Sequence, residues 1–219
     1  MTAAPNPQAL DPTQTKGRVI HWAFGYDLLV WLFFLGRERA FRRRVVQLAR
    51  LDAGQAVLDV GCGTGSLAIA AKQAVGPAGA VEGIDPSAAM IARALKKARK
   101  AGMNVALQQG VIEALPFPDG RFDTVLSTLM LHHLPGAVRE QGVREMRRVV
   151  RPGGRVLVVE FGRARGRRKG FIDHLHRHGG LDPDDLAALM RDAGLEIVER
   201  GTMGSRNMYY LLATPRNGS

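Results

Sequence analysis

The stretch VLDVGCGTGSLAIAA, from Val57 to Ala71, carries three glycines at every second position, Gly61, Gly63 and Gly65. A short apolar run precedes them and an Ala-rich run follows, which predicts a buried strand, a tight turn and a helix. Glycine in such a turn allows a positive φ or the close approach of another group to the backbone. Ligands of open α/β sheets bind beyond the carboxyl ends of the strands, where this turn would lie.

The same alternation of strand and helix continues outward from this stretch. Further strands are predicted at 80–85, 104–110, 121–127 and 154–162, helices at 66–74, 87–101, 137–150 and 182–194, and a pair of strands closes the chain. Strands that alternate with helices form a parallel sheet covered by helices on both faces. The sequence therefore predicts one α/β domain.

The rest of the chain divides into three parts. Residues 1–17 are polar with three prolines and predict a flexible segment, residues 18–50 predict an N-terminal helical cap, and residues 51–215 form the main domain. The net charge of +11 is concentrated at 37–44, 93–100 and 163–170. Such clusters suit nucleic acid, an anionic membrane or an acidic substrate, or form a plain solvated surface.

The single cysteine, Cys62, excludes an internal disulfide and a zinc site built from cysteines. The start of the chain has no basic and then apolar secretion signal, so we expect a cytoplasmic protein. His174, His176 and His178 alternate in DHLHRHGG, a spacing that one face of a strand would align. A metal site, a lid over a pocket and solvated surface all remain open for this segment, and no metal is assigned.

Four ordered motifs carry a family resemblance. VLDVGCGTG, VEGIDPSAAM, GVIEALPFPDGRFDTVLS and RVVRPGGRVLVVEFG closely resemble those of the class I S-adenosylmethionine-dependent methyltransferases, in the subgroup of the ubiquinone/menaquinone C-methyltransferases, over residues 55–162. The resemblance implies a Rossmann-like fold with a mostly parallel seven-stranded sheet and an antiparallel C-terminal strand. It also implies S-adenosyl-L-methionine as cofactor and S-adenosyl-L-homocysteine as product. The glycine spacing alone would leave dinucleotide enzymes open, although Ser66 stands where their third glycine belongs.

The resemblance also assigns roles to single residues. The glycines would lie against the methionine part of the cofactor, Asp59 would hold its ammonium group, and Pro86 and Met90 would flank the adenine. Asp85 would accept two hydrogen bonds from the ribose diol, unless it is only a helix N-cap. The whole predicted cofactor set is Asp59, Gly61, Cys62, Gly63, Gly65, Asp85, Pro86, Met90, Val111, Ile112, Glu113 and Ser127.

Val111 departs from the subgroup, which usually has an acidic residue there to bind the adenine amino group. Valine accepts no hydrogen bond. Backbone groups near Val111 and Ile112, or the side chain of Glu113, are left to hold the adenine.

The segment STLMLHHLPG follows the fourth strand and would face the transferred methyl group. His132 and His133 are the candidates for a general base, with a structural turn held by one imidazole as the alternative. The predicted acceptor pocket is formed by Tyr26, Trp31, His132 and His174.

We therefore expect in-line methyl transfer to a small-molecule or lipid-like acceptor, such as a quinol or phenol ring or an amine. An RNA methyltransferase and a non-catalytic cofactor-binding module are the alternatives. Nucleic acid is not expected as a partner, because the arginine clusters lack interleaved aromatic residues. Residues 26–44 join an apolar run to a basic one, which predicts peripheral contact with the anionic inner face of a membrane, or a helix buried against the domain. The oligomeric state is not predicted.

Overall fold

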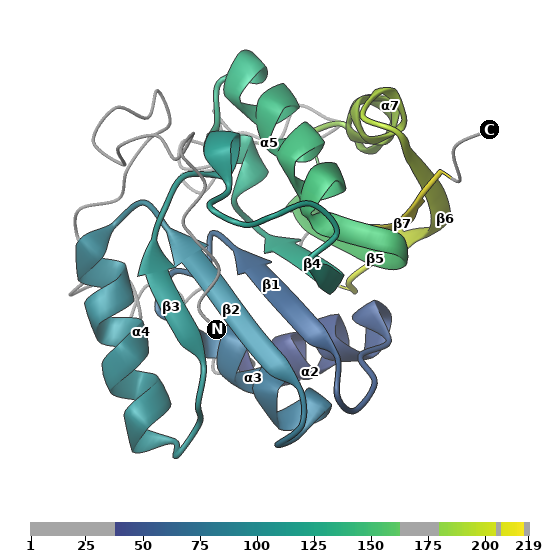
Figure 1. Cartoon of the computed structure of the whole chain (residues 1–219). Helices are drawn as coiled ribbons and strands as arrows, with labels where there is room; N and C mark the ends of the chain where they lie inside the picture. Colours follow the sequence, from purple (N-terminus) through teal and green to yellow (C-terminus); the bar gives the residue numbers. More distant parts are fainter. Residues whose placement is uncertain (1–37, 163–179, 205–206, 217–219) are drawn as a thin grey trace.

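The computed structural model describes residues 38–162, 180–204 and 207–216 (Figure 1). The strands are β1 Ala56–Val60, β2 Ala80–Asp85, β3 Ala106–Gln109, β4 Phe122–Thr128, β5 Val150–Phe161, β6 Leu195–Thr202 and β7 Met208–Pro215. The helices are α2 Glu38–Ala49, α3 Ser66–Val75, α4 Ala88–Lys100, α5 Gly136–Val149 and α7 Pro183–Asp192, with short 3-10 turns η2 Ile112–Ala114 and η3 Leu131–His133.

The strands form a seven-stranded sheet in the order β3-β2-β1-β4-β5-β7-β6. Strands β1 to β5 run parallel, and β7 lies antiparallel between β5 and β6. This arrangement confirms the predicted sheet. The chain crosses from β1 outward to β3 and then returns to β4 on the other side of β1. The strand order therefore reverses between β1 and β4, the place where such sheets bind ligands.

Helices cover both faces of the sheet (Figure 1). One core contains side chains of α2, α3 and α4, and the other contains side chains of α5 and α7. Strands β1, β4 and β5 are buried on both faces, as parallel central strands usually are. Within the described ranges no helix is long and apolar enough to cross a bilayer.

Strand β5 begins earlier than predicted, at Val150 rather than at residue 154. Val150 pairs with Phe122, and the next pairs are Thr124 with Arg155 and Val125 with Val156. The intervening RPGG residues bulge outward, and Gly153 has φ +73°. Proline and glycine predicted a turn that would precede the strand, whereas here the turn interrupts it as a bulge.

Helix α2 packs on the sheet beside α3. Its residues Phe41, Val45 and Leu48 are buried in the same core as α3. Residues 38–50 of the predicted cap therefore lie against the main domain, and the predicted boundaries of the cap stay a prediction. Tyr26, Trp31 and His174, which were predicted for the acceptor pocket, lie outside the described residues.

Candidate functional site

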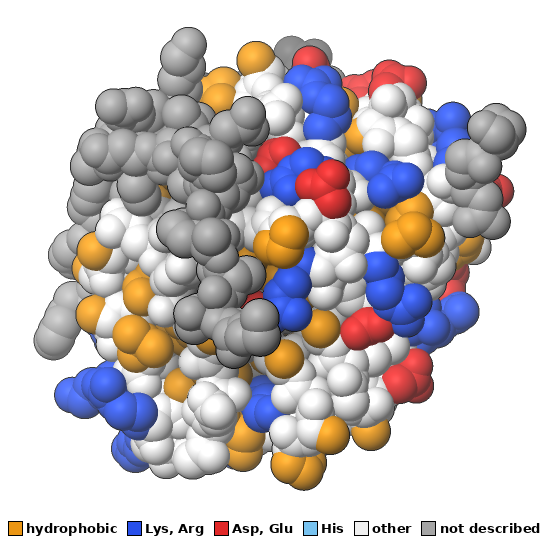
Figure 2. All heavy atoms as spheres, in the orientation of Figure 1, with side chains coloured by type: hydrophobic (Ala, Val, Ile, Leu, Met, Phe, Trp, Pro, Cys, Tyr) orange, Lys and Arg blue, Asp and Glu red, His pale blue; other side chains and the backbone are white. Residues whose placement is uncertain are grey.

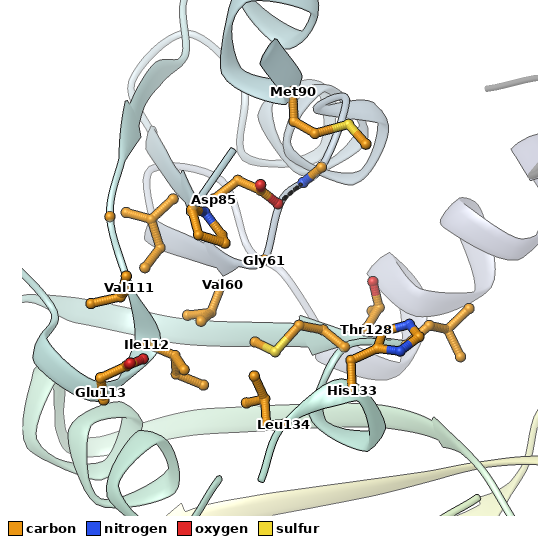
Figure 3. Close-up of a pocket in the computed structure, with 16 residues that line it drawn as sticks. Val60, Gly61, Asp85, Met90, Val111, Ile112, Glu113, Thr128, His133 and Leu134 are labelled. Atoms are coloured by element: carbon orange, nitrogen blue, oxygen red, sulfur yellow. Dashed lines mark hydrogen bonds between the residues drawn. The ribbon is translucent and has the colours of Figure 1, made fainter. Parts of the chain in front are cut away.

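An open cleft lies at the carboxyl ends of β1, β2 and β4 (Figure 3). Eight members of the predicted cofactor set line it: Gly61, Gly63, Asp85, Pro86, Met90, Val111, Ile112 and Glu113. His133 lines the cleft as well, together with the unpredicted Thr128, Leu129, Met130 and Leu134. Asp59, Cys62, Gly65, Ser127 and His132 are not part of this lining within the described chain.

The glycine turn after β1 depends on left-handed backbone. Gly61, Gly63 and Gly65 have φ of +72°, +52° and +77°. A Cβ on Gly61 would lie 2.7 Å from Cγ of Met130, and a Cβ on Gly65 would lie 2.9 Å from Cβ of Ala94 in α4. Gly65 thus allows helix α4 to approach the turn, whereas Gly61 and Gly63 border the cleft.

Asp85 ends β2 and ties the glycine turn to the start of α4. Its Oδ2 accepts a hydrogen bond from the Gly63 N–H at 3.0 Å (Figure 3). Its Oδ1 accepts one from the Ser87 N–H at 2.9 Å. Ser87 is the N-cap of α4, because its hydroxyl accepts from the Met90 N–H, so Asp85 is not that cap. Burial raises the pKa of Asp85, and the two backbone bonds oppose that rise. Each carboxylate oxygen keeps a lone pair for a ligand.

Asp59 lies on β1 beneath the turn and is 1% exposed. Among the described residues, neither of its carboxylate oxygens has a hydrogen-bond partner. Burial raises its pKa to about 7, although the charge of Arg42 in α2 opposes the rise. The Nε of Arg42 is also buried and likewise finds no partner in the described part of the chain. The guanidinium of Arg42 is itself partly exposed and pairs with Glu38 through Nη2 at 3.5 Å, so the carboxylate of Asp59 is the group withdrawn from water.

The turn after β4 contains the two histidines and rests on a buried carboxylate. Glu160 of β5 is 0% exposed and accepts from the N–H groups of Met130 at 2.9 Å and Leu131 at 2.6 Å. Its other oxygen lies 2.6 Å from Nδ1 of His132. The ring of His132 contacts that of His133, with centroids 3.9 Å apart. His133 therefore faces the cleft while His132 is turned toward β5.

Leu129 begins this turn with φ +55°, a conformation that a bulky side chain rarely adopts. Its N–H donates to the Val159 carbonyl at 2.8 Å. Together with the bonds to Glu160, this contact fixes the strained backbone at the edge of the cleft, where such strain is commonly functional. A signal for Glu160 was present in the sequence, since a lone acid in the apolar run VLVVEF requires buried partners.

Three further members of the predicted cofactor set, Val111, Cys62 and Ser127, are buried side chains. Val111 is 2% exposed and forms an apolar part of the cleft lining, next to Ile112 and Glu113 of η2. Cys62 is buried, and burial raises the pKa of its thiol, so it is a poor nucleophile. Ser127 is buried and its hydroxyl lacks a partner among the described residues. The described residues contain no cluster of side chains suited to a metal ion.

Comparisons with known proteins agree with this geometry. Residues 57–154 match the model of a family described as "Methyltransferase domain". The chain is 40% identical over 136 residues to a demethylmenaquinone methyltransferase of Thermus thermophilus, a match that covers 62% of this chain and 60% of that protein. It is 32% identical over 201 residues to a ubiquinone/menaquinone biosynthesis C-methyltransferase of an Enterobacter species, covering 80% of this chain and 79% of the relative.

Four of the curated relatives are longer than the part that aligns, because the chain spans only 55% to 62% of their length. Among solved structures, a SAM-dependent methyltransferase from Aquifex aeolicus superposes with a TM-score of 0.68 at 22% identity. That superposition covers 80% of this chain and 89% of the other. At this identity the likeness concerns the fold alone.

Proposed function

The chain belongs to the class I S-adenosylmethionine-dependent methyltransferases, in the group of the ubiquinone/menaquinone C-methyltransferases, and from this premise we propose that it methylates a quinone-like small molecule. Several relatives are longer than the part that aligns with this chain, so the methyl-transfer activity itself belongs to the proposal. Asp85 is the observation that carries the cofactor part of this proposal. A half-buried carboxylate beside the glycine turn suits a ribose diol and repels a 2′-phosphate.

The residues of the cleft fit the cofactor. Asp85 would hold the ribose, and the apolar side chains of Pro86, Met90 and Val111 would enclose the adenine. Asp59 would receive the ammonium group, because its carboxylate has no hydrogen-bond partner in the described part of the chain and needs a cation or a proton. When bound, the cofactor supplies an activated methyl group on a sulfonium centre.

The chain itself must position the acceptor and remove one proton. An electron-rich ring carbon of the acceptor would form a new C–C bond to the methyl group as the bond between that methyl group and the sulfonium sulfur breaks, and S-adenosylhomocysteine would be the leaving group. The same ring carbon would then lose its proton. His133 faces the cleft and is proposed to accept the proton, or to receive it through a water molecule. Glu160 and His132 are proposed to position the turn that carries His133. Leu129, Met130 and Leu134 provide the apolar surroundings that exclude water.

A transfer assay tests the proposed activity. The protein is incubated with S-adenosylmethionine carrying an isotope-labelled methyl group and with a chemically reduced demethylmenaquinone, and the products are examined by mass spectrometry. We expect labelled methyl on the ring carbon and one S-adenosylhomocysteine for each ring methylated. Cofactor binding without transfer to any quinol or phenol would contradict the proposed acceptor class and leave the cofactor assignment intact.

We also propose that the protein contacts an anionic membrane peripherally, at the inner face of the cell membrane. Arg39 and Arg43 are exposed on the outer face of α2. By contrast, basic and acidic side chains lie side by side on the face that shows α5 (Figure 2). There Arg148 pairs with Asp119 at 2.7 Å and with Glu145 at 2.8 Å. A lipid-like quinol would give such contact a purpose, because the enzyme would then meet its acceptor at the bilayer.

A further inference from the structure

Helix α4 contacts the glycine turn through two residues, Ala94 and Lys97, that lie about one helical turn apart. A Cβ on Gly65 would lie 2.9 Å from the Cβ of Ala94, so the helix packs directly on the turn. On the same face of α4, Nζ of Lys97 donates to Oγ1 of Thr64 at 2.8 Å and to Oγ of Ser66 at 3.0 Å. Lys97 therefore binds both residues that flank Gly65.

The first half of the turn is held from the other side, by β2. The N–H groups of Gly61 and Cys62 donate to the Ile84 carbonyl, both at 2.9 Å. The Gly63 N–H donates to the carboxylate that ends β2, at 3.0 Å. Strand β2 thus fixes the part of the turn that borders the cleft, and Lys97 fixes the part that enters helix α3.

The start of α3 is the weak part of this turn. Its N-cap is Gly65, with φ +77°, which has no side chain to accept from the first N–H groups of the helix. Glycine also has more backbone freedom to lose than any other residue. Thr64, directly before it, is 5% exposed, so its hydroxyl must find partners within the protein. The ammonium group of Lys97 supplies one and restricts the backbone on both sides of the glycine.

We propose that Lys97 is a positioning residue for cofactor binding, because its two hydrogen bonds hold the glycine turn in the shape that the cleft requires. This inference rests on the proposed function. Among the described residues, Lys97 is not part of the lining of the cleft, so it acts through the turn and does not touch the ligand. Without these bonds the turn would adopt other backbone conformations as well. The apparent affinity then falls in proportion to the fraction that remains competent to bind.

The position of Lys97 in the last turn of α4 offers a competing explanation, because a positive charge there stabilises the helix whatever it bonds to. Lys100 lies in the same last turn and is exposed. Lys100→Met therefore serves as the matched control. It removes the same charge from the same turn of the helix and leaves the bonds of Lys97 to the two hydroxyls intact.

Calorimetric titration with S-adenosylhomocysteine measures the effect. Lys97→Met keeps the aliphatic part of the side chain and removes the ammonium group, so its dissociation constant should rise about three- to tenfold. Lys97→Arg retains a cation with several N–H donors for the two hydroxyls, and its dissociation constant should stay within about twofold of that of the unmodified protein. Lys100→Met should also stay within about twofold, as expected for an exposed side chain.

A double-mutant cycle tests whether Lys97 acts through the turn. Thr64→Val keeps the shape of the side chain without the hydroxyl and should weaken binding about two- to fourfold. On the background of Thr64→Val, Lys97→Met should cost less affinity than it costs alone, because one of its two bonds is already absent. Hydrogen exchange of Lys97→Met, measured without added ligand, should be faster at the amides of residues 61–66 and unchanged in β4 and β5. Unchanged exchange in those strands also shows that the variant is folded.

Four results would overturn the role of Lys97. They are an unchanged affinity of Lys97→Met, an equal loss in Lys100→Met, no recovery with arginine, and losses that are strictly additive in the cycle. Faster exchange throughout the sheet in Lys97→Met would overturn it too, because the lysine would then support the whole fold and not the turn. If the unmodified protein did not bind S-adenosylhomocysteine, the proposed function itself would fail.

Discussion

At the scale of one residue, Asp59 illustrates how a buried carboxylate can oppose stability. Its folded-state pKa of about 7 lies above the ordinary value of 3.8 because the carboxyl group is buried. A raised pKa means that its contribution to stability is complete below about pH 4 and is lost as the pH rises through about 7. Above that pH the protein holds a buried negative charge whose oxygens have no hydrogen-bond partner among the described residues.

Replacing Asp59 by Asn should therefore stabilise the ligand-free protein at high pH. We expect Asp59→Asn to raise the melting temperature at pH 8 by about 2–4 °C for each kcal/mol of relieved penalty. The gain should shrink toward pH 5, where the original carboxyl group is protonated. Thermal unfolding at the two pH values measures this, with the exposed Asp192→Asn as control. A variant that is less stable than the unmodified protein at pH 8 would show that the carboxylate is paired after all.

At the scale of elements, the local patterns of the sequence predicted the helices and strands well. Alternation of apolar runs with glycine turns is a local signal, and it placed α3 and α4 to within a residue or two. The bulge in β5 was not predicted, because it depends on the register against β4 rather than on the RPGG residues alone. The cleft residues after β1 and β2 were predicted because their motifs are contiguous. The role of Glu160 was not, since it supports the turn after β4 from β5, a distant element.

Glu160 connects β5 with the turn that holds the histidines, and its replacement tests that connection. The amide oxygen of Glu160→Gln can still accept from the Met130 and Leu131 N–H groups. Its NH₂ group would then donate to Nδ1 of His132 and reverse the tautomer of that ring. We expect affinity for S-adenosylhomocysteine to stay within about twofold while the transfer rate falls at least about tenfold.

Nitrogen-15 NMR of the imidazoles distinguishes this effect from general damage. In the unmodified protein, neutral His132 should carry its proton on Nδ1, and in Glu160→Gln on Nε2. Unchanged transfer with a reversed tautomer would mean that Glu160 holds only the fold of the turn.

At the scale of the whole molecule, the net charge of +11 is unevenly distributed, and the exposed arginines of α2 are proposed to meet anionic lipid. Each arginine near an anionic surface contributes about 1 kcal/mol. The double variant Arg39→Gln, Arg43→Gln should therefore co-sediment less with phosphatidylglycerol vesicles at low salt. The double variant Arg144→Gln, Arg191→Gln removes equal charge from α5 and α7 and should sediment like the unmodified protein. An equal loss of co-sedimentation in both double variants would show that vesicle binding depends on the net charge and not on the arginines of α2.

The central claim, that the cleft takes S-adenosylmethionine and its product, is tested most directly by calorimetric titration. S-adenosylhomocysteine and NAD are each titrated into the protein and into Asp85→Ala, with Asp192→Asn as control. We expect the unmodified protein to bind S-adenosylhomocysteine and not NAD. Asp85→Ala should bind S-adenosylhomocysteine roughly tenfold more weakly or worse, because the charged acceptor of the ribose hydroxyls is gone. Binding of NAD that is tighter than that of S-adenosylhomocysteine would contradict the claim. An unchanged affinity of Asp85→Ala for S-adenosylhomocysteine would contradict it as well.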